Sequence, residues 1–270
     1  MKTLVAVAQM TSTDNKDQNL EICEALIAKA AQKGARFVCF PENFAYFGNG
    51  KEKLEVYAED LAGPSITRLR QQAKKHNIWV SLGGFQERIG QTQKIHNTHV
   101  VVNNHGDVVA NYKKIHLFSA NLPDGTRYNE NKIVREGTRA VVLETPFFKA
   151  GLTICYDLRF AHLFWALRCL GAQVILVPAA FTKLTGQAHW EILLRTRAVE
   201  TQSYILAAAQ VGAHNTRRES YGHAMIVDPW GRIIAQCEEG QDLAWAHIDL
   251  NYIFKIREQM PIKQHWRPLS

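Results

Sequence analysis

Three residues with reactive side chains each stand at the end of a short apolar run of this sequence. Glu42 follows the run FVCFP, Lys114 ends the stretch NYKK, and Cys155 ends the run GLTIC shortly before the helical pattern AHLFWALRCL. A thiol at a strand end that faces the start of a helix lies where its thiolate is stabilised. Free cysteine is also among the most buried residue types, so Cys155 taken alone fits a structural role as well.

Glu42 and Lys114 would give such a thiol the two partners that it needs. The carboxylate lies at the carboxyl end of an expected strand, where open α/β sheets place ligands. The aromatic residues at positions 40, 44, 46 and 47 should desolvate it and raise its pKa, which suits it to proton transfer. A lysine beside an acid and a thiol could hold a developing oxyanion. Because Glu is seldom buried and Lys is almost always exposed, the hypothesis requires that the three residues meet.

The elements that must bring these residues together alternate between strands and helices. Strands are predicted at 4–10, 36–42, 78–87, 139–145, 147–155, 173–180, 204–211 and 243–250. Helices are predicted at 19–34, 65–77, 161–172, 189–203 and 252–260, and hairpins over 97–117 and 221–237. This alternation, with a hairpin in each half, predicts an α/β fold with large mixed sheets. No stretch reads as a flexible linker, so we expect one domain over residues 1–270.

The composition indicates the size of the core and the cellular compartment. The chain has 270 residues, 46% of them hydrophobic, which is enough for one large core. Its five cysteines are irregularly spaced and include no C-x-x-C, so they predict neither a disulfide framework nor a zinc site and are typical of a reducing compartment. The first apolar run is too short for a signal peptide, and no window approaches the ~18 apolar residues that a membrane span needs. We therefore expect a cytoplasmic protein without a membrane partner.

The net charge of +7 and the pI of about 9.2 come from scattered basic residues. No long basic run or nucleic-acid motif accompanies them, so we expect no nucleic-acid partner and favour a basic cleft for a small anion. The sequence has no G-x-S-x-G, H-E-x-x-H or G-x-x-x-x-G-K-[ST] motif. His96 and His99 lie three apart on a predicted strand and so point to opposite faces. We expect no metal and no organic cofactor.

Five blocks of the sequence resemble the nitrilase, or carbon–nitrogen hydrolase, superfamily. They are FPENF, YKKIHLF, GLTICYDLRF, AAFTKLTGQAHWEILLRTRAVETQSYILAAAQVG and SYGHAMIVDPWGRI, and they extend over nearly the whole chain. The resemblance implies a four-layer α-β-β-α sandwich in one carbon–nitrogen hydrolase domain. It also implies pairing through outer helices into a homodimer or a higher homo-oligomer.

The resemblance further implies a Glu-Lys-Cys triad. The catalytic carboxylate, lysine and cysteine of the superfamily correspond to Glu42, Lys114 and Cys155. Lys114 is preferred to Lys113 because the superfamily's lysine directly precedes the triplet IHL. Many members add a second glutamate between the lysine and cysteine blocks, and Glu130 fits that pattern. The implied reaction is hydrolysis of an amide through a cysteine thioester.

One departure from the superfamily's pattern concerns Arg159. The superfamily commonly continues CYDLRF with Pro-Glu-Leu, whereas this chain has Ala161-His162-Leu163. The loss of that glutamate leaves Arg159 either free to meet a substrate carboxylate or held by another acid such as Asp157.

The later blocks are most similar to amidases of the Nit branch that act on deaminated glutathione, a dicarboxylate at neutral pH. The basic chain suits such a substrate, and Arg159, Lys183, Arg217 and Arg218 lie in or beside the matching blocks. Thr182 and His189 should add polar contacts in the cleft. The alternatives are an ω-amidase acting on 2-oxoglutaramate, an N-carbamoyl amino acid hydrolase, a true nitrilase, and a non-enzymatic basic scaffold.

Overall fold

Two β-sheets packed face to face form the centre of the molecule. The computed structural model describes residues 2–49, 52–121 and 125–267. Within them the first sheet runs in the order β13 (Arg218–Tyr221), β12 (Ala209–Asn215), β1 (Lys2–Met10), β2 (Phe37–Phe40), β3 (Trp79–Arg88), β4 (Ile95–Val102), β5 (Val108–Lys113). Strand β16 (Asp242–Asp249) also pairs with β1, in antiparallel register. The second sheet runs β15 (Ile233–Gln236), β14 (Met225–Val227), β11 (Tyr204–Ala207), β10 (Val174–Leu176), β9 (Lys149–Leu152), β8 (Val141–Glu144).

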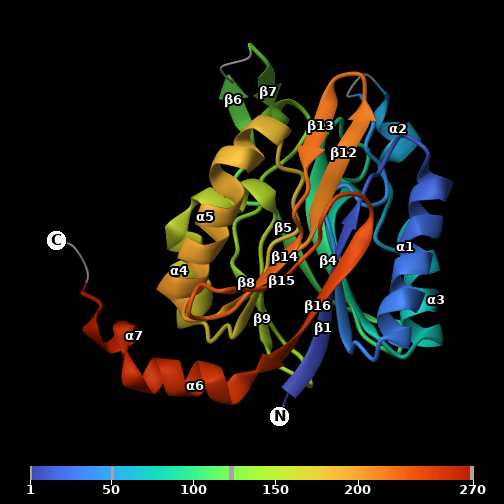
Figure 1. The fold of residues 1–270 in the computed structure, drawn as a ribbon. Helices are drawn as coiled ribbons and strands as arrows, with labels where there is room; N and C mark the ends of the chain where they lie inside the picture. Colours follow the sequence, from blue (N-terminus) through green and yellow to red (C-terminus); the bar gives the residue numbers. More distant parts are fainter. Residues whose placement is uncertain (1, 50–51, 122–124, 268–270) are drawn as a thin grey trace.

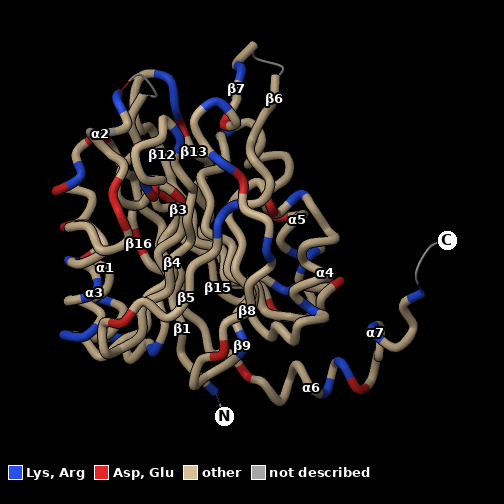
Figure 2. Tube along the Cα trace, turned by 180° about the vertical axis from the view of Figure 1, so that it is seen from behind, with Lys and Arg blue, Asp and Glu red and all other residues tan. Residues whose placement is uncertain are grey.

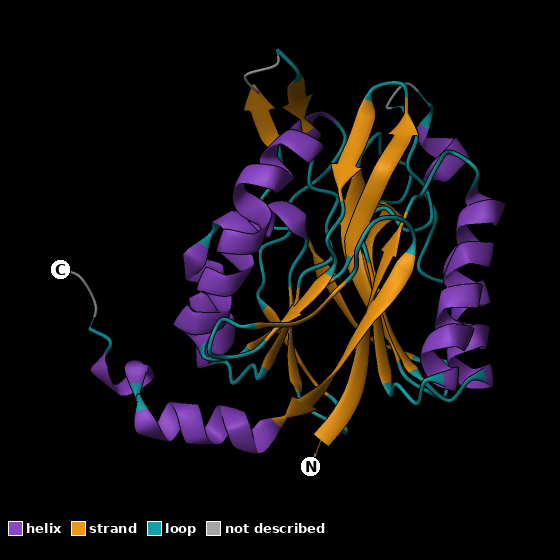
Figure 3. Cartoon of the chain, in the orientation of Figure 1, coloured by secondary structure: helices purple, strands orange, loops and turns teal. Residues whose placement is uncertain are grey.

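Helices cover the outer face of each sheet (Figures 1 and 3). Helices α1 (Lys16–Gln32) and α3 (Pro64–Lys75) lie on the first sheet, and α4 (Ala161–Cys169) and α5 (Lys183–Thr201) lie on the second. The short helix α2 (Leu54–Tyr57) and the ribbon of β6 (Ser119–Asn121) and β7 (Arg127–Asn129) lie at one end of the sandwich, and α6 (Leu250–Gln259) and α7 (Ile262–His265) close the described chain. The α-β-β-α sandwich expected from the sequence is confirmed.

The alternation of side chains along each strand produces these layers. Val5 and Val7 of β1 pack in the cluster between the sheets, whereas Ala6 and Ala8 pack in the cluster beneath α1 and α3. Successive side chains of a strand point to opposite faces, so a strand that is buried on both sides must be apolar throughout. This explains why the central strands read as continuous apolar runs.

Two predicted elements differ from the structure by more than the trimming of their ends. Residues 204–211 read as one strand, but β11 belongs to the second sheet and β12 to the first, with Ala208 between them. The apolar run is unbroken because the chain is buried throughout the crossing from one sheet to the other. Helix α5 begins at Lys183 instead of at residue 189, since the side chain of Thr182 accepts a hydrogen bond from the backbone N–H of Thr185 and caps the helix there.

Basic and acidic residues are dispersed over the molecule. Figure 2 shows Lys and Arg on both outer helix layers and in several loops, interspersed with Asp and Glu. Among the described residues, no helix combines the length and the apolar character needed to cross a membrane.

Candidate active site

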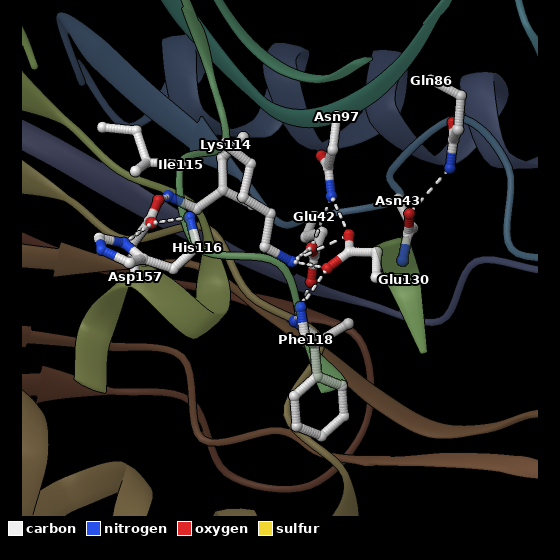
Figure 4. A network of polar contacts seen from close by, with 12 residues as sticks. Glu42, Asn43, Gln86, Asn97, Lys114, Ile115, His116, Phe118, Glu130 and Asp157 are labelled. Carbon is white, nitrogen blue, oxygen red and sulfur yellow. Dashed lines mark hydrogen bonds and ion pairs between the residues drawn. The ribbon is translucent and has the colours of Figure 1, made fainter. Parts of the chain in front are cut away.

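Glu42, Lys114 and Glu130 meet at one end of the sandwich (Figure 4). The Nζ atom of Lys114 lies 3.0 Å from Oε1 of Glu42 and 2.8 Å from Oε2 of Glu130. The side-chain amide of Asn97 donates to Oε1 of both carboxylates, over 2.9 Å and 3.1 Å. Lys114 is 2% exposed and Glu42 is 5% exposed. A buried cation therefore sits between two carboxylates.

Each member of this cluster follows the end of a strand, a position that the sequence predicted for Glu42 and Lys114. Glu42 comes two residues after β2, and Lys114 comes directly after β5. The neighbouring Lys113 is 38% exposed and lies 4.0 Å from Glu87, away from the cluster. Glu130 begins a short 3₁₀-helix, and its Oε2 accepts a hydrogen bond from the backbone N–H of Phe118. Lys114, and not Lys113, is thus the lysine that reaches the acid.

Two glycines in β3 allow the loop that carries Glu42 to sit close to the sheet. A Cβ atom on Gly84, whose φ is +64°, would lie 2.5 Å from Cγ of Glu42. A Cβ atom on Gly83 would lie 2.8 Å from the carbonyl oxygen of Phe40, two residues before Glu42, and 1.9 Å from Cβ of Pro178. These separations are far below van der Waals contact, so larger residues at either position would displace the loop. The pair Gly83-Gly84 therefore helps to set the position of the carboxylate.

Cys155 lies on a strained turn beside Glu42. The chain leaves β9 at Leu152 and enters a 3₁₀-helix at Cys155, whose φ is +48°. Only a few per cent of non-glycine residues adopt such a positive φ, and such strain is concentrated at functional sites. The turn is held by the backbone N–H of Cys155, which donates to the carbonyl oxygen of Pro178 over 2.8 Å. Cys155 is 8% exposed, and its thiol and the Glu42 carboxylate lie close enough for each to shift the pKa of the other.

A buried carboxylate braces this turn. Asp157 accepts hydrogen bonds from the hydroxyl of Tyr112 at 2.7 Å, from the backbone N–H of Ile154 at 2.9 Å and from the backbone N–H of His116 at 3.0 Å. Tyr112 and His116 flank Lys114 in the sequence, and Ile154 directly precedes the cysteine. Asp157 therefore ties the segment of the lysine to the segment of the thiol.

The pKa shifts favour an ionised acid beside a protonated thiol. Burial pushes the pKa of Glu42 upward, but the charge of Lys114 and hydrogen bonds from the thiol, the ammonium and the Asn97 amide outweigh burial and hold it below its usual value. Burial and the Glu42 carboxylate raise the pKa of Cys155 well above its usual value. Burial lowers the pKa of Lys114, but the two glutamates more than compensate and raise it. The raised pKa that the sequence predicted for Glu42 is therefore wrong.

The cluster opens into a cavity of about 320 Å³. Glu42, Lys114, Glu130 and Cys155 all line it. Five aromatic residues contribute to its other walls, namely Phe47, Phe118, Tyr128, Tyr156 and Phe181. Such a cavity has the size and the mixture of apolar wall and few polar groups that small-molecule sites have.

Of the three other residues predicted to contact the substrate, two line the cavity and one does not. Arg159 and Thr182 line the cavity. The guanidinium of Arg159 donates to Nδ1 of His189 over 3.2 Å and lies over the ring of Phe181. His189 is absent from the described lining of the cavity, so it supports Arg159 instead of contacting a ligand. Asp157 does not hold Arg159, because its carboxylate is taken up by the contacts of the brace.

Of the three other basic residues that could bind a substrate carboxylate, one lies in the cavity wall. Arg218 lines the cavity. Lys183 forms an ion pair with Glu219 over 2.8 Å between two half-exposed side chains, and Arg217 is exposed. Of these three, Arg218 is thus the one that a ligand in the cavity would meet.

Asn97 is the functional residue that the sequence interpretation missed. It lies in the stretch HNTH, which had been considered for metal ligands. Asn97 and His99 alternate with His96 and Thr98 along β4, and the side chains of Asn97 and His99 point into the molecule.

Among the described residues, no group of three or more His, Cys, Asp or Glu side chains is arranged to hold a metal ion.

Comparison with known proteins agrees with this geometry. The family model for carbon–nitrogen hydrolases matches residues 4–258. The chain is 46% identical over 269 residues to a deaminated glutathione amidase of Bos taurus, covering 98% of this chain and 82% of that protein. It is 43% identical over 265 residues to a deaminated glutathione amidase of Synechocystis, covering 97% of both.

Solved structures of nitrilase-superfamily proteins are similar to this chain over nearly its whole length. The crystal structure of the NitFhit protein of Caenorhabditis elegans has a TM-score of 0.93 at 41% identity, covering 98% of this chain and 65% of that one. Nit3 of Saccharomyces cerevisiae, a member of branch 10 of the nitrilase superfamily, has a TM-score of 0.84 at 28% identity over 96% of this chain and 94% of that one. The chain belongs to the carbon–nitrogen hydrolase family. It is a hydrolase of carbon–nitrogen bonds other than peptide bonds, as its sequence predicted.

Proposed function

We propose that this protein is a thiol amidase in which Cys155 is the nucleophile, Glu42 the general base and Lys114 an oxyanion donor. The observation that carries the proposal is the position of Glu42. Its buried carboxylate contacts the ammonium group of Lys114 at 3.0 Å, shares the wall of one cavity with Cys155, and is close enough to the thiol to shift its pKa. A base within hydrogen-bond reach of a nucleophile is the arrangement that covalent catalysis requires.

The reaction has two halves. In the first, Sγ of Cys155 attacks the amide carbonyl while its proton passes to Glu42, and the carbonyl electron pair moves to oxygen. When the tetrahedral intermediate collapses, the C–N bond breaks, Glu42 returns the proton to the departing nitrogen, and a thioester remains. In the second half, Glu42 takes a proton from water, which attacks the thioester. The C–S bond breaks, the acid leaves, and the thiol recovers its proton.

The pKa directions suit this sequence of steps. The resting site holds a carboxylate and a neutral thiol, because a thiolate beside Glu42 would bring two negative charges together in a buried site. Proton transfer is then coupled to attack, when the charge moves from sulfur onto the carbonyl oxygen. Lys114 is already charged and in place to stabilise that oxygen.

A second oxyanion donor comes from the backbone. The N–H of Cys155 is committed to Pro178 and so is not available. The next N–H along the chain belongs to Tyr156, in the first turn of the 3₁₀-helix, where N–H groups have no partner within the helix. We assign it this role. Removing one oxyanion donor typically costs on the order of 10²–10³ in rate.

Glu130 and Asn97 position these groups. Glu130 accepts two hydrogen bonds from Lys114 and keeps the ammonium directed into the cavity. Asn97 donates to both carboxylates and so fixes their separation. Glu130 also borders the cavity, where it can accept a hydrogen bond from the substrate nitrogen.

The substrate that we propose is a small amide that carries carboxylates, with deaminated glutathione as the first candidate. Two observations support this choice. Relatives at 43% to 46% identity over nearly the whole chain bear that name. The cavity also holds two arginines beside the buried lysine, which suits an anionic ligand.

A comparison of four substrates on one enzyme preparation tests the proposal. We expect kcat/KM to be highest for deaminated glutathione and lower for 2-oxoglutaramate. For an N-carbamoyl amino acid and a simple nitrile we expect it to be about 10- to 100-fold lower, since a missing charge-assisted contact costs on that order. A higher value for the nitrile or the carbamoyl compound would contradict the substrate assignment. A thioester adduct on Cys155, detected by mass spectrometry after acid quenching, tests the covalent step independently.

We also propose that residues 1–270 act as one domain in a cytoplasmic homo-oligomer. The outer face of α5 supports this, because it exposes Ile192 and Val199 next to Trp230. Apolar residues grouped on an outer helix are typical of an interface. Sedimentation equilibrium would give the number of copies, and a purely monomeric protein at micromolar concentration would contradict the assembly.

A further inference from the structure

Arg218 is partly buried in the wall of the cavity and has one buried N–H group without a partner among the described residues. It begins β13, and its guanidinium lies 4.4 Å from the centroid of the Tyr128 ring and 5.6 Å from that of Phe47. Arg218, Tyr128 and Phe47 all line the cavity that contains Cys155. The Nη1 atom of Arg218 is buried and has no hydrogen-bond partner among the described residues.

An arrangement of this kind is unfavourable in the absence of a ligand. Buried polar groups are almost always hydrogen-bonded, and an unsatisfied charged donor is among the most costly exceptions. Among the described residues, the other buried side-chain atoms without a partner are amide oxygens, Oε1 of Gln86 and Oδ1 of Asn97. Arg218 therefore supplies the one cationic group of this set, and it does so inside the cavity.

The surroundings of Arg218 indicate the chemistry of its partner. A guanidinium is planar and presents parallel N–H groups that match the two oxygens of a carboxylate. The rings of Tyr128 and Phe47 contact it and restrict its orientation without using its N–H groups. Glu42, Lys114 and Glu130 together carry one net negative charge, which would repel an anionic substrate. Cations elsewhere in the cavity wall, Arg159 and Arg218, therefore have to offset that charge for a carboxylated amide to approach the thiol.

We propose that Arg218 binds a carboxylate of the substrate and sets the preference of the site for carboxylated over neutral amides. The inference deepens the proposed function, because it takes the ligand of the cavity to be the amide that Cys155 attacks. Arg159 is less suited to the role of primary anchor, since it already donates to His189. Arg217 and Lys183 are excluded by their exposure and by the ion pair of Lys183 with Glu219.

Binding measured without turnover tests the inference. The Cys155→Ala variant is titrated by calorimetry with deaminated glutathione and with its dimethyl ester, alone and with Arg218→Gln added. We expect Arg218→Gln to weaken binding of the dicarboxylate about 10- to 100-fold, the range of one charge-assisted contact, and to leave binding of the ester unchanged. Arg217→Gln, one residue away and exposed, is the matched control and should change neither affinity.

The outcomes separate this inference from the proposed function. Equal loss of affinity for both ligands, or no loss for the dicarboxylate, would overturn the role of Arg218. If Arg218→Gln does not fold, Arg218→Lys carries the test, because it keeps the charge and loses the planar fork; it should reduce the preference for the dicarboxylate over the ester. Arg218-dependent binding by an enzyme that does not hydrolyse the ligand when Cys155 is present would refute the proposed function and support the anchor.

Discussion

Replacing Lys114 by methionine should expose the electrostatic balance of the site. Lys114 is 2% exposed and separates Glu42 from Glu130, with Nζ–O distances of 3.0 Å and 2.8 Å. Methionine keeps most of the apolar stem and removes the charge. Breaking a buried ion pair by removing one partner costs about 3–5 kcal/mol, because the remaining charge is left uncompensated. For a chain of this size that corresponds to a fall in Tm of roughly 10 °C at pH 7.

The loss of stability in Lys114→Met should depend on pH. In the wild type the pKa of Glu42 is lowered, so its contribution to stability is present above the usual glutamate pKa and is lost as the pH falls through the lowered value. In Lys114→Met the charge and the hydrogen bond of the ammonium no longer oppose burial, so the pKa of Glu42 rises. The folded variant then binds more protons than its unfolded state, so it loses stability as the pH rises. The difference in stability between the two proteins should therefore shrink between pH 7 and pH 4.

Chemical denaturation at several pH values measures this difference. Lys113→Met is the matched control, because Lys113 is 38% exposed and lies 4.0 Å from Glu87, so its loss should cost less than about 1 kcal/mol. The double variant Lys114→Met/Glu130→Gln should recover part of the lost stability by removing one of the two facing charges. A Lys114→Met protein as stable as the wild type at pH 7, or a difference that does not change with pH, would refute the reasoning.

Three further predictions concern the nucleophile, its base and the amide that positions the base. Cys155→Ala should abolish hydrolysis and leave the fold intact. Cys169→Ala is the control and should keep full activity, because Cys169 is exposed. A tenth of wild-type turnover in Cys155→Ala would rule out the covalent mechanism. Adding Glu42→Gln to Cys155→Ala should cost little more, because residues that act as a unit are strongly non-additive. Asn97→Ala should raise the pKa of Glu42 by removing a hydrogen bond to its charged form, so the acid limb of the kcat/KM profile should move to higher pH; an unchanged limb would exclude this role.

The sequence was a good guide to the position of the site because strand ends gather at the edge of a sheet. Apolar runs located β2, β5 and β9, and the residues just beyond them meet where the two sheets pack face to face. The same runs were a poor guide where burial continues through a crossing, as it does between β11 and β12. An apolar pattern reports that a segment is buried and does not report which sheet it belongs to.

The environment of Glu42 could not be derived from its neighbours in the sequence. Phe44 belongs to the core beneath α1 and α3, where it stacks on Phe85, and Phe47 stacks on His214. The groups that set the pKa instead come from segments far along the chain, with Lys114 72 residues away and the Ala180 N–H 138 residues away. The aromatic residues nearby in the sequence predict desolvation and a raised pKa for Glu42. Donors from distant segments instead lower its pKa.

The stretch HNTH shows what a better interpretation of the sequence would have found. Asn97 and His99 share one face of β4, and that face lies inside the molecule. Asn97 donates to the two glutamates, while Nδ1 of His99 donates to the carbonyl oxygen of Thr153 over 2.9 Å, two residues before Cys155. Burial lowers the pKa of His99 to about 4, so it serves here as a neutral hydrogen-bonding group. Polar residues two apart in a strand that is otherwise valine-rich must find buried partners, and here those partners are the base and the segment of the nucleophile.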